Sequence, residues 1–297
     1  MKTFIGLVTF GNLPFSKLTY QSILDTVESP YQVCIVVGKP GDNETIQWAN
    51  NLNLPHIVHD INYGFPYSIN DMYDWGFSRE YEAYIAIGND VIAYKYAIDN
   101  MIKVAETTDY EWICAREVSV KDLCKSYPEI QSYFSGGNFI FNDFTARPWE
   151  VFKGYGLNTA CDEGGLSDVH NLALYTKSAI DKLGYVDVNY YPAYYEDNDY
   201  ARRGVLTGVK STTLDKTYYF HFWSRTIKQE SGGSTGDQFR NNRKYYKDKW
   251  GGDFGSEKFD IPFNGQPYLL GGMQMPSEIK ISNRDYEQAA INYWRSK

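Results

Sequence analysis

The 297-residue sequence has few cysteines, no long apolar run and no excess of positive charge. Its four cysteines show neither C-x-x-C pairing nor zinc-site spacing, and Cys34 and Cys114 fall in apolar runs that predict buried strands. We therefore expect a reducing compartment. The apolar run near the N-terminus is too short for a secretory signal or a membrane span, and it ends without a cleavage-type site. These absences favour a cytoplasmic protein without a membrane span.

Acidic residues outnumber basic ones, 37 to 29. The formal net charge is −8, which argues against general binding to a phosphate backbone, because such binding needs a basic footprint. A local basic stretch at 240–249 is either a solvated helix face or a contact surface for nucleic acid.

Tyrosine, by contrast, is abundant. The chain contains 27 Tyr, 16 Phe and 7 Trp, and Tyr combines a flat apolar ring with a hydrogen-bonding tip. Such rings suit stacking on sugars or bases, and they serve equally well in a core.

The first 115 residues alternate apolar, β-branched runs with helical patterns. Strands are expected at 3–10, 32–38, 56–59, 83–88 and 110–115. Helices are expected at 14–27, 42–52, 67–80 and 94–106. This β-α-β order predicts an α/β fold with a mostly parallel sheet that helices cover on both faces.

After residue 116 the pattern is less regular. The expected elements there are a strand at 139–141, mixed helices over 142–183, a helix at 195–204, a strand at 218–222, a helix at 236–249 and a helix at 284–295. Trp250-Gly251-Gly252 is a typical helix stop.

An apolar run at 84–87 ends in Gly88-Asn89-Asp90. Ligands of α/β proteins bind beyond the carboxyl ends of the strands, and one carboxylate there suits a divalent cation that a phosphorylated ligand completes. The alternative is an Asp that ends the strand and caps the helix near residue 94.

Two further candidates lie in the second half of the chain. Glu196-Asp197 at the head of a short helix provides a candidate general base, or else an acidic N-cap followed by an Asp–Arg pair one turn apart. His221 lies in an aromatic strand, where it is either a ligand that suits Mn²⁺ better than Mg²⁺ or a packed side chain.

Polar, glycine-containing turns follow the first and third expected strands. These are Thr9-Phe10-Gly11-Asn12 and Asn62-Tyr63-Gly64-Phe65. Their backbone groups and Asn side chains could contact the edge of a nucleobase, although ordinary βα turns have the same composition.

Taken in order, these segments resemble a GT-A fold glycosyltransferase, and they are most similar to glycosyltransferase family 2. The resemblance covers roughly residues 3–250. It rests on Thr9-Phe10, on Asn62-x-Gly64 with Asn70 and Gly76, on Asn89-Asp90, on Ser135-Gly136-Gly137, on Glu196-Asp197 with Asp199 and Arg203, on His221, and on Lys249-Trp250-Gly251.

The resemblance implies a Rossmann-like, mostly parallel central sheet flanked by helices. It also implies a glycosyltransferase domain over 1–252, with a nucleotide-binding half at 1–116 and an acceptor half at 117–252. A C-terminal extension at 253–297 follows.

The implied activity is an inverting transfer of a hexosyl or pentosyl group from a nucleotide-diphosphate sugar, expected to be a UDP-sugar. Asp197 is the implied base, and Asp90 and His221 are the implied ligands of Mn²⁺ or Mg²⁺. The residues expected around the donor are Thr9, Phe10, Asn12, Lys39, Asn62, Gly64, Asn89, Gly137, Glu196, Trp223 and Arg225.

The acceptor is expected to be a hydroxyl of a glycan, a small molecule or a modified nucleic acid. One departure from the family pattern is Gly88, which stands where the metal motif usually begins with Asp. It leaves open a weak or optional metal, and also a non-catalytic protein of the same fold that binds sugar nucleotides or carbohydrates. A nucleotidyltransferase is disfavoured because the turn after the first strand supplies no cation before Lys17.

Overall fold

The computed structural model describes residues 1–117, 161–162, 171–222 and 236–265. The described strands form one sheet in the order β3-β2-β1-β4-β8-β6-β9-β5, with β7 paired to β9. The strands are β1 (Thr3–Thr9), β2 (Tyr31–Val37), β3 (His56–Val58), β4 (Ala83–Gly88), β5 (Val91–Ala93), β6 (Trp112–Glu117), β7 (Cys161–Asp162), β8 (Leu172–Thr176) and β9 (Ser211–His221).

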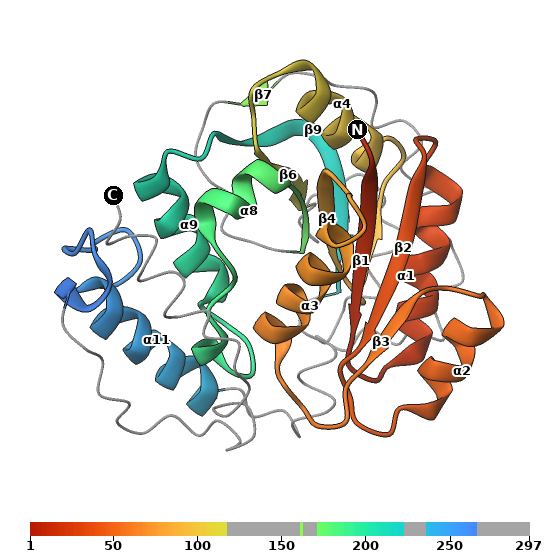
Figure 1. Cartoon of the computed structure of the whole chain (residues 1–297), viewed down its shortest axis with the longest axis horizontal. Helices are drawn as coiled ribbons and strands as arrows, with labels where there is room; N and C mark the ends of the chain where they lie inside the picture. Colours follow the sequence, from red (N-terminus) through yellow and green to blue (C-terminus); the bar gives the residue numbers. More distant parts are fainter. Residues whose placement is uncertain (118–160, 163–170, 223–235, 266–297) are drawn as a thin grey trace, which may run out of the picture.

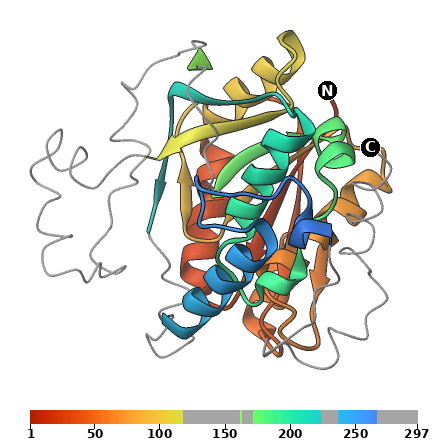
Figure 2. The ribbon, with the colours of Figure 1, turned by 90° about the vertical axis from the view of Figure 1, so that its left-hand side faces the viewer.

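The helices cover both faces of this sheet (Figure 1). The α-helices are α1 (Leu13–Thr26), α2 (Asn43–Asn51), α3 (Phe65–Phe77), α4 (Ala97–Thr107), α8 (Lys177–Leu183), α9 (Glu196–Thr207) and α11 (Gly236–Trp250). In the described part of the chain, the 3₁₀ turn η3 (Val188–Tyr190) precedes α9 and the 3₁₀ turn η4 (Pro262–Gly265) follows α11. Figure 2, seen from the side of α9 and α11, shows both of these helices in front of the sheet.

Most of the described strands run in one direction. Strands β3, β2, β1 and β4 are mutually parallel, as expected for strands joined by the crossover helices α1, α2 and α3. Strand β8 is antiparallel to both β4 and β6, so β6 and its parallel neighbour β9 point the same way as β4. The mostly parallel α/β fold predicted from the sequence is confirmed, and both predicted halves of the chain contribute strands to the one sheet.

Alternating side chains of β1 enter two separate cores. Ile5 and Leu7 pack with Ile23 of α1 on one face, whereas Phe4 and Val8 pack on the other face with residues of α3, α8 and α9. Burial on both faces explains why the strand is apolar at nearly every position rather than at every second one. The free thiols of Cys34 and Cys114 are both buried, as expected.

The predicted elements of the first 115 residues are confirmed to within a few residues, with one addition. The short strand β5 follows Asp90, and α4 therefore begins at Ala97 rather than near residue 94. The interpretation of Asp90 as a helix cap is wrong, because the N-cap of α4 is Tyr96. The mixed helices expected over 142–183 include, in the described part, the strand β8 before α8; the strand at 139–141 and the helix at 284–295 lie outside the described residues.

Two residues of the family resemblance prove to be packing residues of α3. A Cβ on Gly76 would lie 2.0 Å from a ring carbon of Phe4, so only glycine permits this approach of helix and strand. The side chain of Asn70 exchanges two hydrogen bonds of 2.8 Å with the backbone of Val186, as a neighbouring strand would. Asn70 thereby ties α3 to the segment that leads into α9.

Candidate functional site

A pocket of about 550 Å³ lies at the carboxyl ends of the parallel strands. It brings together many of the residues predicted from the sequence, although they come from distant parts of the chain. These are Thr9, Phe10, Asn62, Gly64, Asn89, Asp90, Glu196, Asp197 and His221. Their shared location fulfils the geometric condition for one binding site, and their individual roles stay predictions.

Other predicted residues lie elsewhere. Asn12 and Lys39 do not line this pocket. Asn12 is the N-cap of α1 in a left-handed conformation, and its buried Nδ2 donates no hydrogen bond to a described residue. Gly137, Trp223 and Arg225 lie outside the described residues.

Strand pairing explains why the first wall of the pocket forms. Val8 pairs with Gly88 across the parallel strands β1 and β4, so the residues that follow each strand emerge side by side. The Thr9 hydroxyl donates to the carbonyl of Val36 at 2.9 Å, and the Gly38 amide donates to the carbonyl of Thr9 at 2.8 Å. These bonds fix the ends of β1 and β2 at the edge of the sheet where α/β proteins bind ligands.

The β3 turn is fastened to the opposite wall. The side chain of Asn62 accepts a hydrogen bond from the Gly64 amide at 3.0 Å, which closes the turn before α3. The next amide, that of Phe65, donates to the carbonyl of Pro192 at 2.7 Å. Gly64 has φ +86° and a Cβ there would lie 2.9 Å from the ring of Tyr191, so this position requires glycine on both grounds.

Asp90 and His221 meet because β5 and β9 pair. The antiparallel register joins Val91 to His221, and the Phe222 amide donates to the Asp90 carbonyl at 2.9 Å. This pairing leaves Asp90 Oδ1 only 3.3 Å from His221 Nε2 at the edge of the pocket. The two side chains, 131 positions apart in the sequence, are therefore juxtaposed by the sheet itself.

The other ring nitrogen of His221 has partners that sequence analysis missed. The Asn171 side-chain amide lies 3.0 Å from Nδ1, and Glu117 Oε2 lies 3.8 Å from it. Burial lowers the pKa of His221, but hydrogen bonding and charge from Asp90 and Glu117 outweigh burial and raise this pKa to about 9. No motif marks Asn171 or Glu117, because each reaches His221 only through the pairing of strands distant in sequence.

The Asp90–His221 pair suits a cation that a ligand helps to hold. Within the described ranges, no group of three or more His, Cys, Asp or Glu side chains could hold a metal ion by itself. A carboxylate oxygen and an imidazole nitrogen are both donors that divalent cations accept, and here they lie 3.3 Å apart. Mg²⁺ is commonly held by one or two carboxylates together with substrate phosphates, so a site with one carboxylate and one imidazole would need a phosphorylated ligand to complete it.

Glu196 and Asp197 form the second wall, at the first turn of α9. Asp197 is half-buried, lines the pocket, and accepts a hydrogen bond from the Asn198 amide at 2.8 Å. Glu196 is buried, and its Oε2 accepts no hydrogen bond from a described residue. Burial, reinforced by the charge of Asp197, raises the pKa of Glu196 well above its usual value. The two neighbouring carboxyl groups therefore differ in environment.

The acidic N-cap considered for this segment is not observed, because the N-cap is Tyr195 and makes no side-chain capping bond. The Asp–Arg pair one turn apart is confirmed: Arg203 Nη2 lies 2.8 Å from Asp199 Oδ2. Both side chains are buried, and Arg203 Nη1 also donates to the carbonyls of Leu183 and Tyr185. Asp199 and Arg203 thus anchor α9 to the segment at the end of α8.

Lys249 and Trp250 complete that anchor from α11. Trp250 Nε1 donates to Asp199 Oδ1 at 2.8 Å, and Lys249 Nζ lies 2.8 Å from the same oxygen. Lys249 Nζ also donates to Asp187 Oδ2 at 2.7 Å. Burial alone would raise the pKa of Asp187, but the charge and hydrogen bond of Lys249 outweigh it and lower this pKa. The Lys-Trp-Gly segment is therefore bonded directly to the helix that carries Glu196-Asp197.

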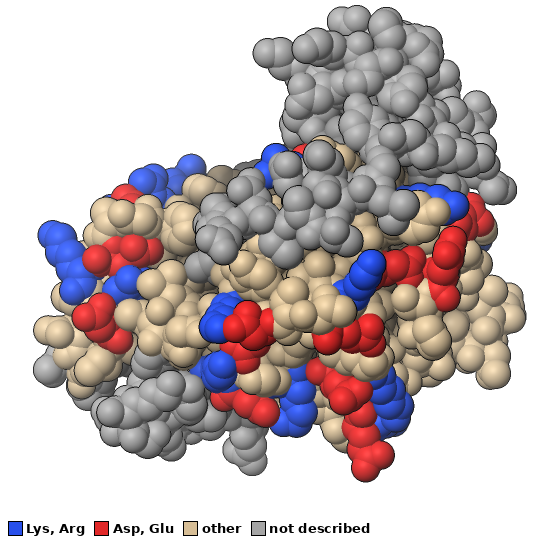
Figure 3. Space-filling model, turned by 90° about the horizontal axis from the view of Figure 1, so that it is seen from above, with Lys and Arg blue, Asp and Glu red and all other residues tan. Residues whose placement is uncertain are grey.

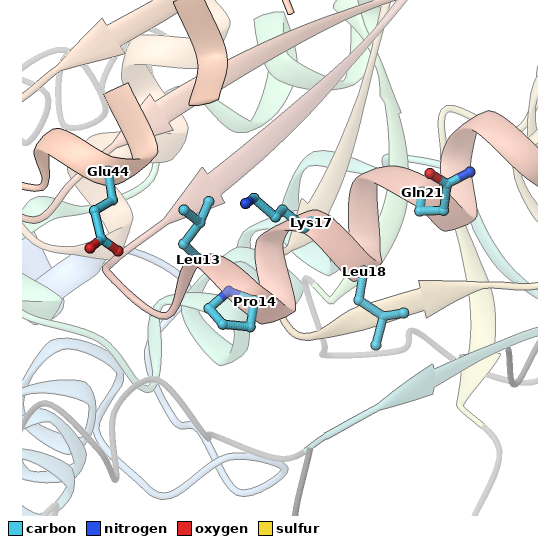
Figure 4. Close-up of a pocket in the computed structure, with 6 residues that line it drawn as sticks. All are labelled: Leu13, Pro14, Lys17, Leu18, Gln21 and Glu44. Carbon is cyan, nitrogen blue, oxygen red and sulfur yellow. The ribbon is translucent and has the colours of Figure 1, made fainter. Parts of the chain in front are cut away.

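A second hollow, of about 590 Å³, lies between α1 and α2 (Figure 4). It is lined by Leu13, Pro14, Lys17, Leu18, Gln21 and Glu44. It contains none of the predicted site residues, and Figure 4 shows that aliphatic and polar side chains line it in equal number. Of these two hollows, only the first contains predicted site residues.

The surface charges of the described residues are mixed in sign. On the face seen in Figure 3, Lys and Arg side chains of the described residues alternate with Asp and Glu rather than forming a continuous basic surface. On α11, Arg243 likewise pairs with Asp253, and Lys244 pairs with Asp248. None of the helices in the described ranges is both long and apolar enough to traverse a bilayer.

Comparison with known proteins identifies the fold. No protein-family model matches the chain, and no curated protein matches it. The chain does match the crystal structure of S. aureus TarS with a TM-score of 0.54 and 13% identity, over 83% of this chain and 39% of that one. The fold is a GT-A glycosyltransferase fold.

Two ligand complexes of TarS 1-349 match as well. The complex with UDP has a TM-score of 0.54 and 14% identity, over 82% of this chain and 63% of that one. The complex with UDP-GlcNAc has a TM-score of 0.53 and 14% identity, over 82% and 64% of the two chains. The chain therefore spans less than two thirds of the length of these structures.

Proposed function

We propose that the protein is an inverting glycosyltransferase that uses a nucleotide-diphosphate sugar, with a UDP-sugar as the donor. The observation that carries this proposal is the single pocket that joins the strand ends of β1, β3 and β4 to the Glu196-Asp197 turn of α9. A donor across the strand ends would place its anomeric carbon between the nucleotide wall and an acceptor-side carboxylate. The choice of UDP is supported by the TarS complexes with UDP and UDP-GlcNAc.

Asp197 is the proposed general base. Its half-buried carboxylate lines the pocket, so it is accessible to an acceptor hydroxyl. The acceptor oxygen forms a bond to C1 of the donor sugar while its proton passes to Asp197. The bond from C1 to the diphosphate oxygen breaks on the opposite face, and its electron pair leaves with the nucleoside diphosphate. Positioning rather than high basicity gives such a carboxylate its effect.

Asp90 and His221 are the proposed holders of a divalent cation. Mn²⁺ or Mg²⁺ bound there would neutralise charge that develops on the leaving diphosphate. The carboxylate and imidazole donors fit Mn²⁺ better than Mg²⁺. Because His221 gains a proton readily in this environment, it must lose that proton before its nitrogen can act as a ligand.

The Asp197→Asn variant tests the base. We expect transfer, measured as UDP released from UDP-sugars in the presence of acceptor, to fall at least about a hundredfold, because general base catalysis contributes at least that much. UDP binding should be unchanged. The control is Asp181→Asn, which removes an exposed carboxylate of α8 and should retain normal turnover. Near-normal turnover of Asp197→Asn would show that the base is another group.

The second candidate function is a non-catalytic protein that binds sugar nucleotides or carbohydrates. It is favoured by Gly88, which stands where the family's metal motif normally has a carboxylate. A panel of sugar nucleotides separates the two functions, since only an enzyme releases free UDP. Binding of a UDP-sugar without UDP release, with and without Mn²⁺ and across a panel of acceptors, would favour the binding protein.

A further inference from the structure

The N-terminal turn of α11 adds a polar group to the pocket that sequence analysis did not single out. Gln238 lines the pocket together with Ala193, Tyr194 and Asp197. Its Oε1 is buried, yet it accepts no hydrogen bond from any described residue. A buried acceptor without a partner is destabilising, so such a group in a pocket calls for a donor from a ligand or solvent.

An exposed aromatic group adjoins Gln238. The Phe239 ring is 43% exposed, although it is a large apolar side chain. It packs against two neighbouring rings, with its ring centroid 5.8 Å from that of Tyr194 and 5.1 Å from that of Tyr195. Tyr194 also lines the pocket, so the aromatic group is continuous with the wall that carries Asp197.

Asn242 holds this wall together one turn further along α11. Its Nδ2 lies within hydrogen-bond distance of three carbonyl oxygens, 3.0 Å from Tyr190, 2.8 Å from Ala193 and 3.0 Å from Tyr194. Asn242 is itself buried. The loop before α9 and the first turns of α11 are thereby fixed to each other, and a ligand would meet a preformed surface.

We propose that this surface is the acceptor subsite and that the acceptor is a saccharide. The inference deepens the proposed transferase and, for the word acceptor, rests on it. A pyranose ring presents an apolar face of C–H groups and a rim of hydroxyls. The apolar face matches the exposed ring of Phe239, and a hydroxyl on the rim supplies the donor that Gln238 Oε1 lacks. Asp197 lies on the same wall, within the pocket where a further hydroxyl would react.

The other acceptor classes match this surface less well. An acyl chain would need an extended apolar groove, whereas the aromatic group here is compact and borders a polar pocket. A nucleic acid would need a basic surface, but the cations of α11 at Arg243 and Lys244 are paired with acidic side chains. The combination of one supported ring and one unpaired amide oxygen is the pattern expected for a sugar.

Binding of model saccharides to the full chain tests the proposal. The probes are cellobiose, chitobiose and maltose, with sorbitol as a polyol that has hydroxyls but no ring face. Saturation-transfer NMR is recorded with and without saturating UDP. We expect at least one disaccharide to bind through its ring protons and sorbitol not to bind. Equal binding of sorbitol, or binding of no disaccharide to a protein that binds UDP, would overturn the proposal.

Matched variants locate the binding. Phe239→Ala should weaken the disaccharide about five- to tenfold, the loss of one aromatic contact. Phe254→Ala should not, although Phe254 is equally exposed at 45% and packs on Tyr246 instead. Gln238→Met, which keeps the side-chain length but removes the amide, should weaken it about tenfold. Equal effects of Phe239→Ala and Phe254→Ala would contradict the assignment.

Binding of the nucleotide donor shows whether Phe239 serves the acceptor or the donor. UDP affinity should be the same in all three variants, and a parallel loss of UDP-sugar affinity in Phe239→Ala would mean that the ring serves the donor instead. If the disaccharide binds with the expected variant pattern but UDP does not bind to the wild-type chain, the saccharide subsite stands and the transferase proposal fails. The two proposals can therefore fail separately.

Discussion

Lys249 and Asp199 form a buried ion pair, with Nζ 2.8 Å from Oδ1. The same ammonium group bonds to Asp187 at 2.7 Å, so one cation of α11 serves two carboxylates on the other side of the interface. Asp199 lies two positions after Asp197 on α9. The position of the proposed base therefore depends on a charge contributed by a different helix.

The Lys249→Met variant tests this dependence. The substitution removes the ammonium group that both buried carboxylates, Asp187 and Asp199, contact. Loss of one partner of a buried ion pair costs about 3–5 kcal/mol. We expect the free energy of unfolding, measured in urea, to fall by that amount. Lys247→Met provides the control, because Lys247 is 49% exposed and pairs with Asp253 at the surface, where a pair contributes about 0–1 kcal/mol. Similar losses in both variants would argue against the buried anchor.

The Glu196→Gln variant has a pH-dependent effect whose sign follows from the raised pKa of Glu196. Below about pH 4.5 the carboxyl is protonated in both the folded and the unfolded chain. The Glu196→Gln substitution should therefore change the free energy of unfolding very little there. Above that pH the unfolded chain loses a proton that the folded chain keeps, so wild-type stability falls as pH rises. The advantage of Gln should then grow by at most about 1.4 kcal/mol per pH unit until the folded carboxyl ionises.

Urea unfolding of both proteins at pH 4, 5, 6 and 7 measures this difference. Glu28→Gln controls for the loss of one carboxylate, because Glu28 is exposed and its exchange should change stability by less than about 0.5 kcal/mol. A stability difference between Glu196→Gln and wild type that does not increase with pH would show that Glu196 is ionised in the folded chain.

The Asp90→Ala variant tests the proposed cation site. Because Asp90 and His221 would hold the metal against the diphosphate, their removal should weaken UDP binding at least about tenfold in Mn²⁺ and leave it unchanged in EDTA. Calorimetric titration of UDP measures both conditions, and His221→Ala should behave in the same way. Asp60→Ala is the control, since Asp60 is an exposed carboxylate that bonds Tyr63. Equal affinity of wild type for UDP in Mn²⁺ and EDTA would remove the metal from the mechanism.

Much of the fold could be predicted from the sequence, since each early strand is a short β-branched run bounded by turn residues. Burial on both faces makes such strands continuously apolar, and this separates them from the amphipathic helices. The strand β8 was missed because Leu172–Thr176 is short and is followed at once by α8. Its antiparallel insertion between β4 and β6 depends on tertiary pairing that local patterns do not encode.

The site was predictable to the extent that its residues end strands or begin helices. Asp90 and Asp197 occupy such positions, and strand ends of one direction meet at one edge of a sheet. Gln238 was not predictable, because it lies in a polar helix whose pattern shows only a solvated face. Its approach to the pocket depends on Asn242 and the loop that Asn242 holds, a contact between segments about 50 residues apart.

The pairing of β5 with β9 has a consequence for how the Asp90–His221 pair can vary. Side chains alternate along a strand, so a slip of one residue in β9 would present Phe220 or Phe222 where His221 now faces Asp90. The two donors are thus either both in place or separated by an aromatic ring, with no intermediate spacing. The backbone hydrogen bonds of the β5–β9 pairing therefore set the distance between these two side chains.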